Sequence, residues 1–340
     1  MTVTREAPQV REVSTSSLVL TPAVVAHRGA SGHRPEHTLE AYRTAIRMGV
    51  DDIELDLVAT RDGVLVARHD LELSATTDVA ERPGLAHLRR TLVVDGVEQQ
   101  GWFVQDLTIA QLKTLAARER MPGTRPGNTA YDGVEGVPTL TEVLATVRAE
   151  SARRGRPVGV ALELKHAAHH DAVGLPLDVP LLRELARQGL DHPWARVTLM
   201  SFEAPVLRRL AARTRLPVVR LLDRGHRLTS EELDDIDDYA DGLGVHTSLV
   251  LPRDAGGAVG APSSLVRDAH RRGLTVHVWT VRAENRFLPT DLRRGTAPDA
   301  LGDMAGEVRA LLAAGVDGII TDHPEQALAV LRERPVPAVG

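Results

Sequence analysis

The stretch Asp52-Ile-Glu-Leu-Asp-Leu57 carries two carboxylates, Glu54 and Asp56, at alternate positions of a segment that is otherwise typical of a β-strand. Because successive side chains of a strand point to opposite faces, the two acids share one face and the apolar residues between them share the other. The acids then lie roughly 7 Å apart and repel each other by about 2 kcal/mol at an effective dielectric constant of roughly 20. We therefore expect a divalent cation between them; solvated acids on an exposed sheet edge are the alternative.

The rest of the chain, from Ala23 onward, alternates strand-like segments with amphipathic helical segments. Eight such units without a long linker favour a closed (β/α)₈ TIM barrel, an α/β fold. A doubly wound dinucleotide-binding sheet loses its support because the chain has no Gly-x-Gly-x-x-Gly motif. We predict strands at Val24–His27, Asp52–Val58, Val158–Lys165, Val197–Ser201, Pro217–Leu222, Gly242–His246, Thr275–Thr280 and Gly318–Thr321. We predict helices at Thr38–Met48, Leu140–Glu150, Val179–Gln188, Ala204–Arg213, Ser263–Arg272, Ala305–Ala314 and Pro324–Arg332.

One long segment, residues 71–137, interrupts this alternation and is interpreted as an insertion on the barrel rim after the second strand. It contains turn signals such as Arg125-Pro-Gly127 and one helical run, Ile109–Ala117. Just before it, a turn at Asp62-Gly63 predicts a hairpin that returns the chain to the same end of the barrel. The resulting division is an N-terminal arm (residues 1–22), a single catalytic barrel domain (23–334) and a tail (335–340).

Composition limits the kind of partner. The 340 residues have 43% hydrophobic content, a formal charge of −5 and no cysteine. Such a chain has no basic field for nucleic acid, no apolar run long enough for a membrane span, and only oxygen or imidazole ligands for a metal. We expect a small-molecule partner, and the sequence carries no signal for the oligomeric state. The arm has no signal-peptide apolar core, which predicts a cytoplasmic protein.

Further reactive residues fall where the predicted strands end, which in such a barrel is the catalytic face. His27 and Arg28 end the first strand, Glu163 and Lys165 end the third, and His69 follows the hairpin. Adjacent side chains of a strand point to opposite faces, so His27 and Arg28 cannot both point into the barrel as strand residues. The turn that follows must direct one of the two side chains inward. A buried structural ion pair is the alternative interpretation of the third strand's acid and lysine.

Other polar and aromatic residues receive weaker assignments. Trp279, at the end of the seventh strand, is interpreted either as a contact for the substrate or as a packing residue of the barrel mouth. Glu36 either favours the N-terminus of the helix that follows it or braces the turn at His27 and Arg28. The histidines to which we assign no function are His33, His37, His166, His169, His170, His246, His277 and His323.

Several ordered motifs resemble those of glycerophosphodiester phosphodiesterases, particularly the branch typified by bacterial periplasmic enzymes. They are Ala26-His-Arg-Gly-Ala-Ser-Gly32, Pro35-Glu-His-Thr38, Glu54-Leu-Asp56, His69-Asp70, Thr77-Asp-Val79, Thr139-Leu-Thr-Glu142, Glu163-Leu-Lys165, Val278-Trp-Thr-Val-Arg282 and Gly315-Val-Asp-Gly318 with Thr321-Asp322. The resemblance implies a TIM barrel that hydrolyses glycerophosphodiesters, such as glycerophosphocholine and glycerophosphoethanolamine, to sn-glycerol 3-phosphate and an alcohol. It also implies a periplasmic or extracellular location, against the plain N-terminus.

The resemblance also implies roles for particular residues. Glu54, Asp56 and Glu163 match the family's ligands for one Ca²⁺ or Mg²⁺, His27 and His69 its acid–base pair, and Arg28 and Lys165 its phosphate-facing cations. The assignment of base and acid stays open, as does the choice between an internal attack that forms a cyclic phosphate and a direct attack by water. The competing functions are a lysophospholipase D-type phosphodiesterase acting on lipid-tailed substrates and a non-catalytic binding barrel.

Overall fold

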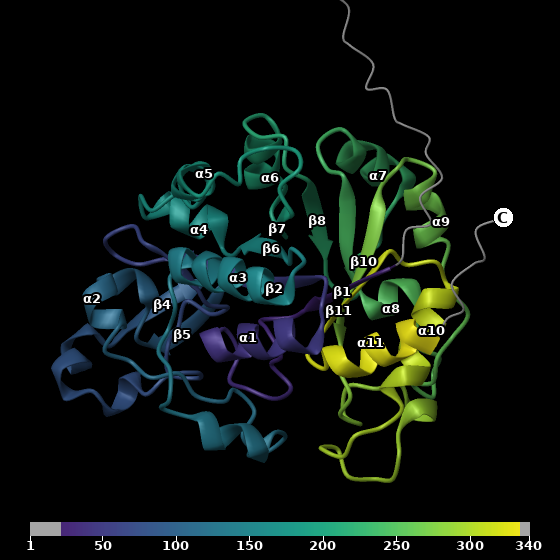
Figure 1. Cartoon of the computed structure of the whole chain (residues 1–340), viewed down its shortest axis with the longest axis horizontal. Coiled ribbons are helices and arrows are strands. Elements are labelled where there is room, and N and C mark those ends of the chain that lie inside the picture. Colours follow the sequence, from purple (N-terminus) through teal and green to yellow (C-terminus); the bar gives the residue numbers. More distant parts are fainter. Residues whose placement is uncertain (1–21, 334–340) are drawn as a thin grey trace, which may run out of the picture.

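A computed structural model describes residues 22–333, so the predicted tail and all but the last residue of the predicted arm lie outside the described residues. Eight parallel strands form a closed barrel, because the order of neighbours runs from β1 through β11 back to β6 and β2, and β1 also pairs with β2. Figure 1 shows helices packed around these strands. The barrel predicted from the sequence is therefore confirmed. Its strands are β1 Ala23–Ala26, β2 Asp52–Ala59, β6 Gly159–Leu164, β7 Val197–Ser201, β8 Val218–Leu222, β9 Gly242–His246, β10 Thr275–Val281 and β11 Gly318–Thr321.

Helices follow the strands, as a βα alternation requires. The longer ones are α1 Leu39–Met48, α3 Leu140–Arg154, α5 Asp178–Arg187, α6 Ala204–Ala211, α7 Ser230–Asp237, α10 Met304–Ala313 and α11 Pro324–Glu333. The short ones are α4 Ala167–Ala172, α8 Thr247–Val250 and α9 Leu265–His270. The first, α1, begins where the Thr38 side chain accepts the Ala41 N–H and ends at Gly49, whose φ of 109° suits glycine. Helix α7 was not predicted, although Thr229 caps its start by accepting the Glu232 N–H.

The core lies between the barrel and its helices, and the alternation in β2 explains why. Ile53, Leu55 and Leu57 are fully buried in this layer, as expected from the sequence. Glu54 and Asp56 therefore point to the barrel interior. A smaller apolar group, which includes Val25, Met200 and Ile320, fills the interior beneath them.

The segment between the barrel's second strand and α3 builds a separate lobe on one side of the barrel, where Figure 1 shows β4, β5 and α2. The predicted hairpin is present, since β3 Leu65–Ala67 pairs antiparallel with β2. Beyond it, β4 Arg90–Val94 and β5 Val97–Gly101 form a second hairpin over a core of their own that includes Phe103 and Leu107. The lobe also has 3₁₀ turns at Val79–Glu81, Pro83–Leu88, Val104–Asp106 and Pro126–Tyr131; another lies outside the lobe, at Thr290–Leu292.

The predicted helix Ile109–Ala117 is wrong over its second half. The helix α2 spans Ile109–Leu112, because the residues that follow are used in extended pairing. Ala116 bridges to Gly136 and Ala117 bridges to Thr77. Tertiary pairing thus overrides the local helical preference.

Among residues 22–333, no helix combines the length and the apolar composition that crossing a bilayer requires.

Candidate active site

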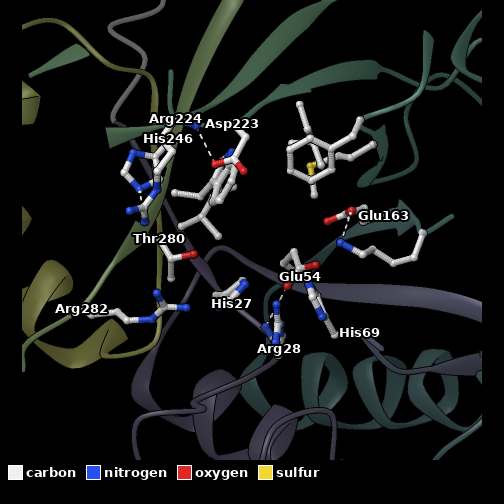
Figure 2. A pocket seen from close by; sticks show the side chains of 16 residues that line it. His27, Arg28, Glu54, His69, Glu163, Asp223, Arg224, His246, Thr280 and Arg282 are labelled. Carbon is white, nitrogen blue, oxygen red and sulfur yellow. Dashed lines mark hydrogen bonds and ion pairs between the residues drawn. The ribbon is translucent and has the colours of Figure 1, made fainter. Parts of the chain in front are cut away.

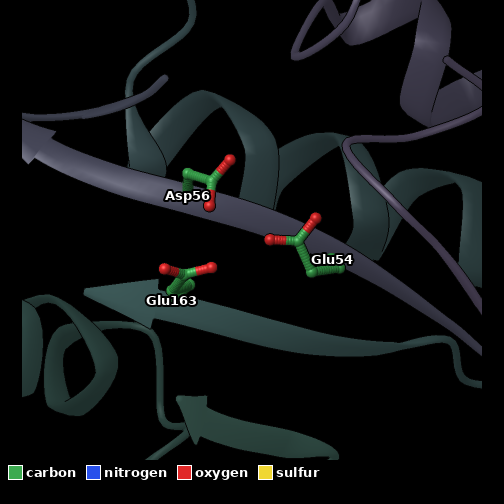
Figure 3. A group of neighbouring side chains, drawn as sticks. All are labelled: Glu54, Asp56 and Glu163. Atoms are coloured by element: carbon green, nitrogen blue, oxygen red, sulfur yellow. The ribbon is translucent and has the colours of Figure 1, made fainter. Parts of the chain in front are cut away.

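Three carboxylates converge inside the barrel at the carboxyl ends of its strands. Asp56 of β2 and Glu163 of β6 are direct neighbours in the parallel register, and Glu54 lies one inward position earlier on β2. One oxygen from each lies within 4.8 Å of the others, and all three residues are buried. Figure 3 shows the three groups turned toward a common point between the two strands. The convergence expected from strand parity is therefore present.

Burial and mutual repulsion make this cluster costly. Burial, together with the charges of Asp56 and Glu163, raises the pKa of Glu54 well above its usual range. Burial also raises the pKa of Glu163 to about 8, although Lys165 opposes this. Burial alone would raise the pKa of Asp56 too, but Arg28, His69, His37 and Lys165 together outweigh burial and hold that pKa well below its usual range. The cluster as a whole still lacks positive charge.

Arg28 is turned into the cluster by the backbone. Its φ of 59° is in the left-handed region, which brings a side chain that parity would point outward round to the same mouth as His27. Its backbone N–H donates to Glu54 Oε2 at 2.8 Å, and its Nε lies 3.1 Å from Asp56 Oδ2. The next residue must be glycine, since a Cβ at Gly29 would lie 2.6 Å from a backbone atom of Ala41.

Two histidines face the same cavity, and each is held by an aspartate. His27 Nδ1 donates to Asp322 Oδ1, and His69 Nδ1 donates to Asp70 Oδ1, both at 2.6 Å. These bonds place the proton on Nδ1 and leave each Nε2 as an acceptor. Burial and the charge of Arg28 lower the pKa of His27 to about 4 and that of His69 to about 3. Both rings are therefore neutral near pH 7.

The cavity between these groups has a volume of about 340 Å³. Figure 2 shows His27, Arg28, Glu54 and His69 on one side of it. The Lys165 ammonium lies 2.9 Å from Glu163 Oε1 and 5.3 Å from the centre of the Phe202 ring. A volume of this size suits a small polar ligand.

The opposite wall is built from the carboxyl ends of β9 and β10 and from the loops after β8 and β10. Asp223, Arg224 and His246 lie there in Figure 2. Trp279 packs edge to face against both Phe202 and His246, with ring centres 5.5 Å apart in each pair, and its Nε1–H donates to the Gly244 carbonyl. Trp279 lines the cavity and is also a packing residue of its mouth.

Two histidines to which the sequence analysis assigned no function lie at the site. His246 is on the cavity wall. His37 is buried and donates from Nε2 to Asp56 Oδ2 at 2.8 Å, while the Tyr42 hydroxyl donates to its Nδ1 at 2.7 Å. Such contacts fix the orientation of the carboxylate. The contacts of His37 depend on its left-handed backbone conformation, with φ of 57°. No sequence pattern reveals this conformation.

Asp322 is a further site residue; the sequence analysis quotes it in the Thr321-Asp322 motif but assigns it no role. It directly follows β11, so its position at a strand end was an available signal. Glu36 takes the bracing role considered for it, since both its oxygens lie 3.1 Å from Arg28 Nη1. Arg120 of the rim lobe grips the same carboxylate, with Nε 2.6 Å from Oε2.

The residues present fit a divalent cation. Glu163 Oε1 is buried and accepts no well-aligned hydrogen bond despite the nearby lysine. Glu54 and Asp56 each have one oxygen held by protein donors, which directs the carboxylates into the cluster. A set of three carboxylates without sulfur or imidazole is the donor chemistry that Ca²⁺ and Mg²⁺ prefer.

A closed TIM barrel that gathers an acidic cluster and two aspartate-held histidines at the carboxyl ends of its strands has the arrangement of an enzyme active site. Residues 27–326 match the model of the glycerophosphoryl diester phosphodiesterase family. The chain belongs to this family and is thus a phosphoric diester hydrolase.

Individual relatives agree with this assignment. The chain is 31% identical over 325 residues to a glycerophosphodiester phosphodiesterase of Arabidopsis thaliana, covering 88% of this chain and 83% of that protein. It is 32% identical over 265 residues to a probable glycerophosphodiester phosphodiesterase of Mycobacterium tuberculosis, covering 76% and 82%.

Solved structures share the fold. A glycerophosphoryl diester phosphodiesterase, so named provisionally, from Silicibacter pomeroyi superposes with a TM-score of 0.69 at 24% identity, covering 93% of this chain and 95% of that one. The structure of an Oleispira antarctica phosphodiesterase in complex with the product sn-glycerol-3-phosphate superposes with a TM-score of 0.62 at 21% identity. The match covers 92% of this chain and 98% of that chain.

The bracing of Arg28 by Glu36 leads to a stability prediction. Replacing Glu36 by Gln leaves two arginines with a weakened partner in a buried setting, which should lower the free energy of unfolding by about 3 kcal/mol at pH 7. The arginines hold the pKa of Glu36 well below its ordinary value of 4.5. The difference between wild type and variant should therefore be complete above that pH and shrink as the pH falls below it.

Equilibrium denaturation with urea at pH 7 and at lower pH measures this difference. The matched control is Glu81→Gln, because Glu81 pairs with Arg118 on the lobe surface and is 63% exposed. Solvent screens this pair, so the control should change stability far less than E36Q does. Equal stability of E36Q and wild type at pH 7 would contradict the assigned role.

Proposed function

We propose that the protein hydrolyses glycerophosphodiesters to sn-glycerol 3-phosphate and an alcohol, with one Ca²⁺ or Mg²⁺ held by Glu54, Asp56 and Glu163. The observation that carries this proposal is the placement of three converging buried carboxylates and two neutral histidines around one cavity. The product complex of the Oleispira antarctica relative supports sn-glycerol 3-phosphate as the product. Water is consumed: its oxygen ends on phosphorus, and the bond from phosphorus to the alcohol oxygen breaks.

Charge neutralisation is the first requirement of this chemistry, because a phosphodiester monoanion repels an oxygen nucleophile. When bound, the cation supplies Lewis-acid stabilisation of charge on the phosphate oxygens. Lys165 and Arg28 line the same cavity and bring fixed positive charge to the phosphate. Arg28 is the more rigid of the two, since three carboxylates hold it.

His27 and His69 exchange protons with the substrate. A neutral ring with a free Nε2 is ready to remove a proton from the attacking hydroxyl or water. The other ring must carry a proton for the departing alkoxide, and the phosphate anion favours that protonated state by opposing the charge of Arg28. Each ring is held in the same way by its aspartate, so either histidine can act as the base or as the acid. The same two histidines serve whether the nucleophile is the glycerol 2-hydroxyl or water.

The alcohol portion of the substrate lies against the wall formed by Asp223, Arg224, His246 and Trp279. This wall offers the Asp223 carboxylate, the Arg224 guanidinium and the aromatic surface of Trp279. Such groups suit small polar alcohols such as choline, ethanolamine or glycerol. The lipid-tailed alternative has one observation in its favour: Val93 and Val97 are more than half exposed on the β4–β5 hairpin, whose turn contacts His166 beside the cavity. The larger apolar side chains Leu85, Trp102 and Phe103 of the same lobe are buried in its core and so offer no lipid-binding surface.

Metal and substrate can be tested together. Chelator-stripped protein should be inactive on glycerophosphocholine and glycerophosphoethanolamine and should regain activity with Ca²⁺ or Mg²⁺. Glu54→Gln combined with Asp56→Asn should abolish both the recovery and calorimetric binding of the added ion. Faster turnover of a lysophospholipid than of either water-soluble substrate would favour the lipid alternative, and metal-independent activity would remove the cation from the proposal.

The histidines should each contribute about 10²–10⁴-fold to turnover. We expect His27→Ala and His69→Ala to lose kcat by that amount while calorimetry shows unchanged metal affinity, because neither ring is among the three ligands. His192→Ala, which changes an exposed histidine after α5, is the control and should keep full activity. A variant of either cavity histidine with wild-type kcat would exclude that residue from catalysis.

Trp279 should act through binding rather than through chemistry. Trp279→Ala removes aromatic surface from the alcohol wall, and we expect KM to rise about tenfold with kcat little changed. Trp279→Phe keeps an aromatic face and should restore most of the affinity. A fall in kcat without a rise in KM would instead assign Trp279 to packing of the mouth.

A further inference from the structure

Both cavity histidines are held by the same three-part arrangement, and in each case the rim lobe contributes an outer arginine. The aspartate that accepts from the imidazole has a second oxygen, and an arginine of the lobe binds that oxygen. At His27 the same aspartate oxygen also accepts from Arg282 Nε at 2.7 Å, so the lobe arginine shares that oxygen with a barrel residue. The two lobe arginines, Arg120 and Arg125, are five residues apart in one short segment. Neither arginine contacts the three carboxylates of the acidic cluster, and neither exchanges a proton in the proposed reaction, so the roles described so far do not explain them.

Arg125 serves His27. Its Nη2 lies 2.6 Å from Asp322 Oδ2, its Nε donates to Glu284 Oε1 at 2.6 Å, and its Nη1 donates to the Ser31 carbonyl at 2.9 Å. The side chain is 6% exposed, so these contacts are made away from solvent. Each of the three guanidinium nitrogens thus has a partner at the barrel mouth.

Arg120 serves His69. Its Nη1 lies 2.6 Å from Asp70 Oδ2, while its Nε and Nη2 bind both oxygens of Glu36. Glu36 in turn holds Arg28. A single lobe residue therefore connects the acid that holds His69 with the arginine that lies against the acidic cluster.

We propose that Arg120 and Arg125 are positioning residues for the two catalytic histidines, so that the rim lobe is a working part of the active site. A carboxylate with both oxygens engaged cannot rotate, and it then holds the imidazole in one tautomer with Nε2 directed into the cavity. This inference rests on the proposed function.

The arginines also act on the charge that each imidazole meets. The charged groups facing His27 are Arg28, Asp322 and Arg282, and those facing His69 are Arg28, Asp56, Asp70 and Lys165. Each lobe arginine partly cancels the negative charge of the aspartate. Its loss leaves that aspartate more effective at stabilising the imidazolium, which should raise the pKa of the ring it serves.

The test uses Arg120→Gln and Arg125→Gln in the full-length, metal-loaded enzyme, with the pH dependence of kcat measured for each. We expect kcat to fall about 10- to 100-fold with KM changed less than about threefold, as for other outer-shell partners. One limb of the pH profile should also move upward by about one unit. The acid limb moves if the affected histidine is the base, and the alkaline limb moves if it is the acid, so the two variants together assign the roles.

Control and rescue variants separate positioning from folding. Arg118→Gln changes an arginine of the same segment that pairs only with exposed Glu81, and it should leave kcat and the pH profile unchanged. Arg120→Lys and Arg125→Lys keep the positive charge but lose the planar set of guanidinium donors. They should therefore show the wild-type pH dependence of kcat, while kcat itself recovers only part of the loss seen in the Gln variants.

Two further measurements complete the test. ¹⁵N spectra of the histidine side chains, assigned with the His27→Ala and His69→Ala variants, should show each ring with its proton on Nδ1 in the wild type and a raised pKa in the matching variant. The inference would be overturned if kcat and the pH profile were unchanged in the variants. It would also be overturned if the loss of kcat were fully explained by a smaller folded fraction, as measured by thermal unfolding. A wild-type enzyme that is inactive on every diester would instead overturn the proposed function, and the ¹⁵N titrations would still decide the positioning role.

Discussion

The site depends on holding three carboxylates together away from solvent. With oxygens within 4.8 Å of one another, Glu54, Asp56 and Glu163 repel strongly in a setting where water screens little. Burial and this repulsion raise the pKa of two of the three. A fold that keeps such a cluster must surround it with positive charge, and removing a partner from a buried charge typically costs about 3–5 kcal/mol. The neighbouring cations are therefore part of the architecture as well as of the chemistry.

Arg28 links that constraint to proton transfer. The guanidinium that keeps the pKa of Asp56 low is also, after burial, the largest influence lowering the pKa of both His27 and His69. The charge that makes the acidic cluster tolerable thus keeps the two imidazoles neutral before a substrate binds. In the proposed reaction, a bound phosphate anion weakens that effect when one ring needs a proton. The same electrostatic field would then maintain a base before binding and permit an acid after it.

The sequence predicted those features that depend on local periodicity. Alternation in β2 placed Glu54 and Asp56 inward, and the strand order placed Glu163 beside them, because neighbouring parallel strands bring their carboxyl ends to one face. It could not predict features that depend on distant contacts. The left-handed turn at Arg28 is imposed by packing at Gly29, and the second half of the predicted helix Ile109–Ala117 was lost to pairing with Thr77 and Gly136.

The rim lobe is fixed to the barrel mouth by ion pairs and is not a lid over the cavity. A lid must separate from the mouth at little cost, which requires contacts that water can replace. Here the joint includes Arg125, buried between two buried acids, Asp322 and Glu284, and Arg120, clasped by Glu36. Lifting the lobe would leave several charges unpaired in a poorly solvated interface, at a cost of several kcal/mol for each. Access to the cavity is more readily provided across the opposite wall, where Asp223 and Arg224 are exposed on the loop after β8.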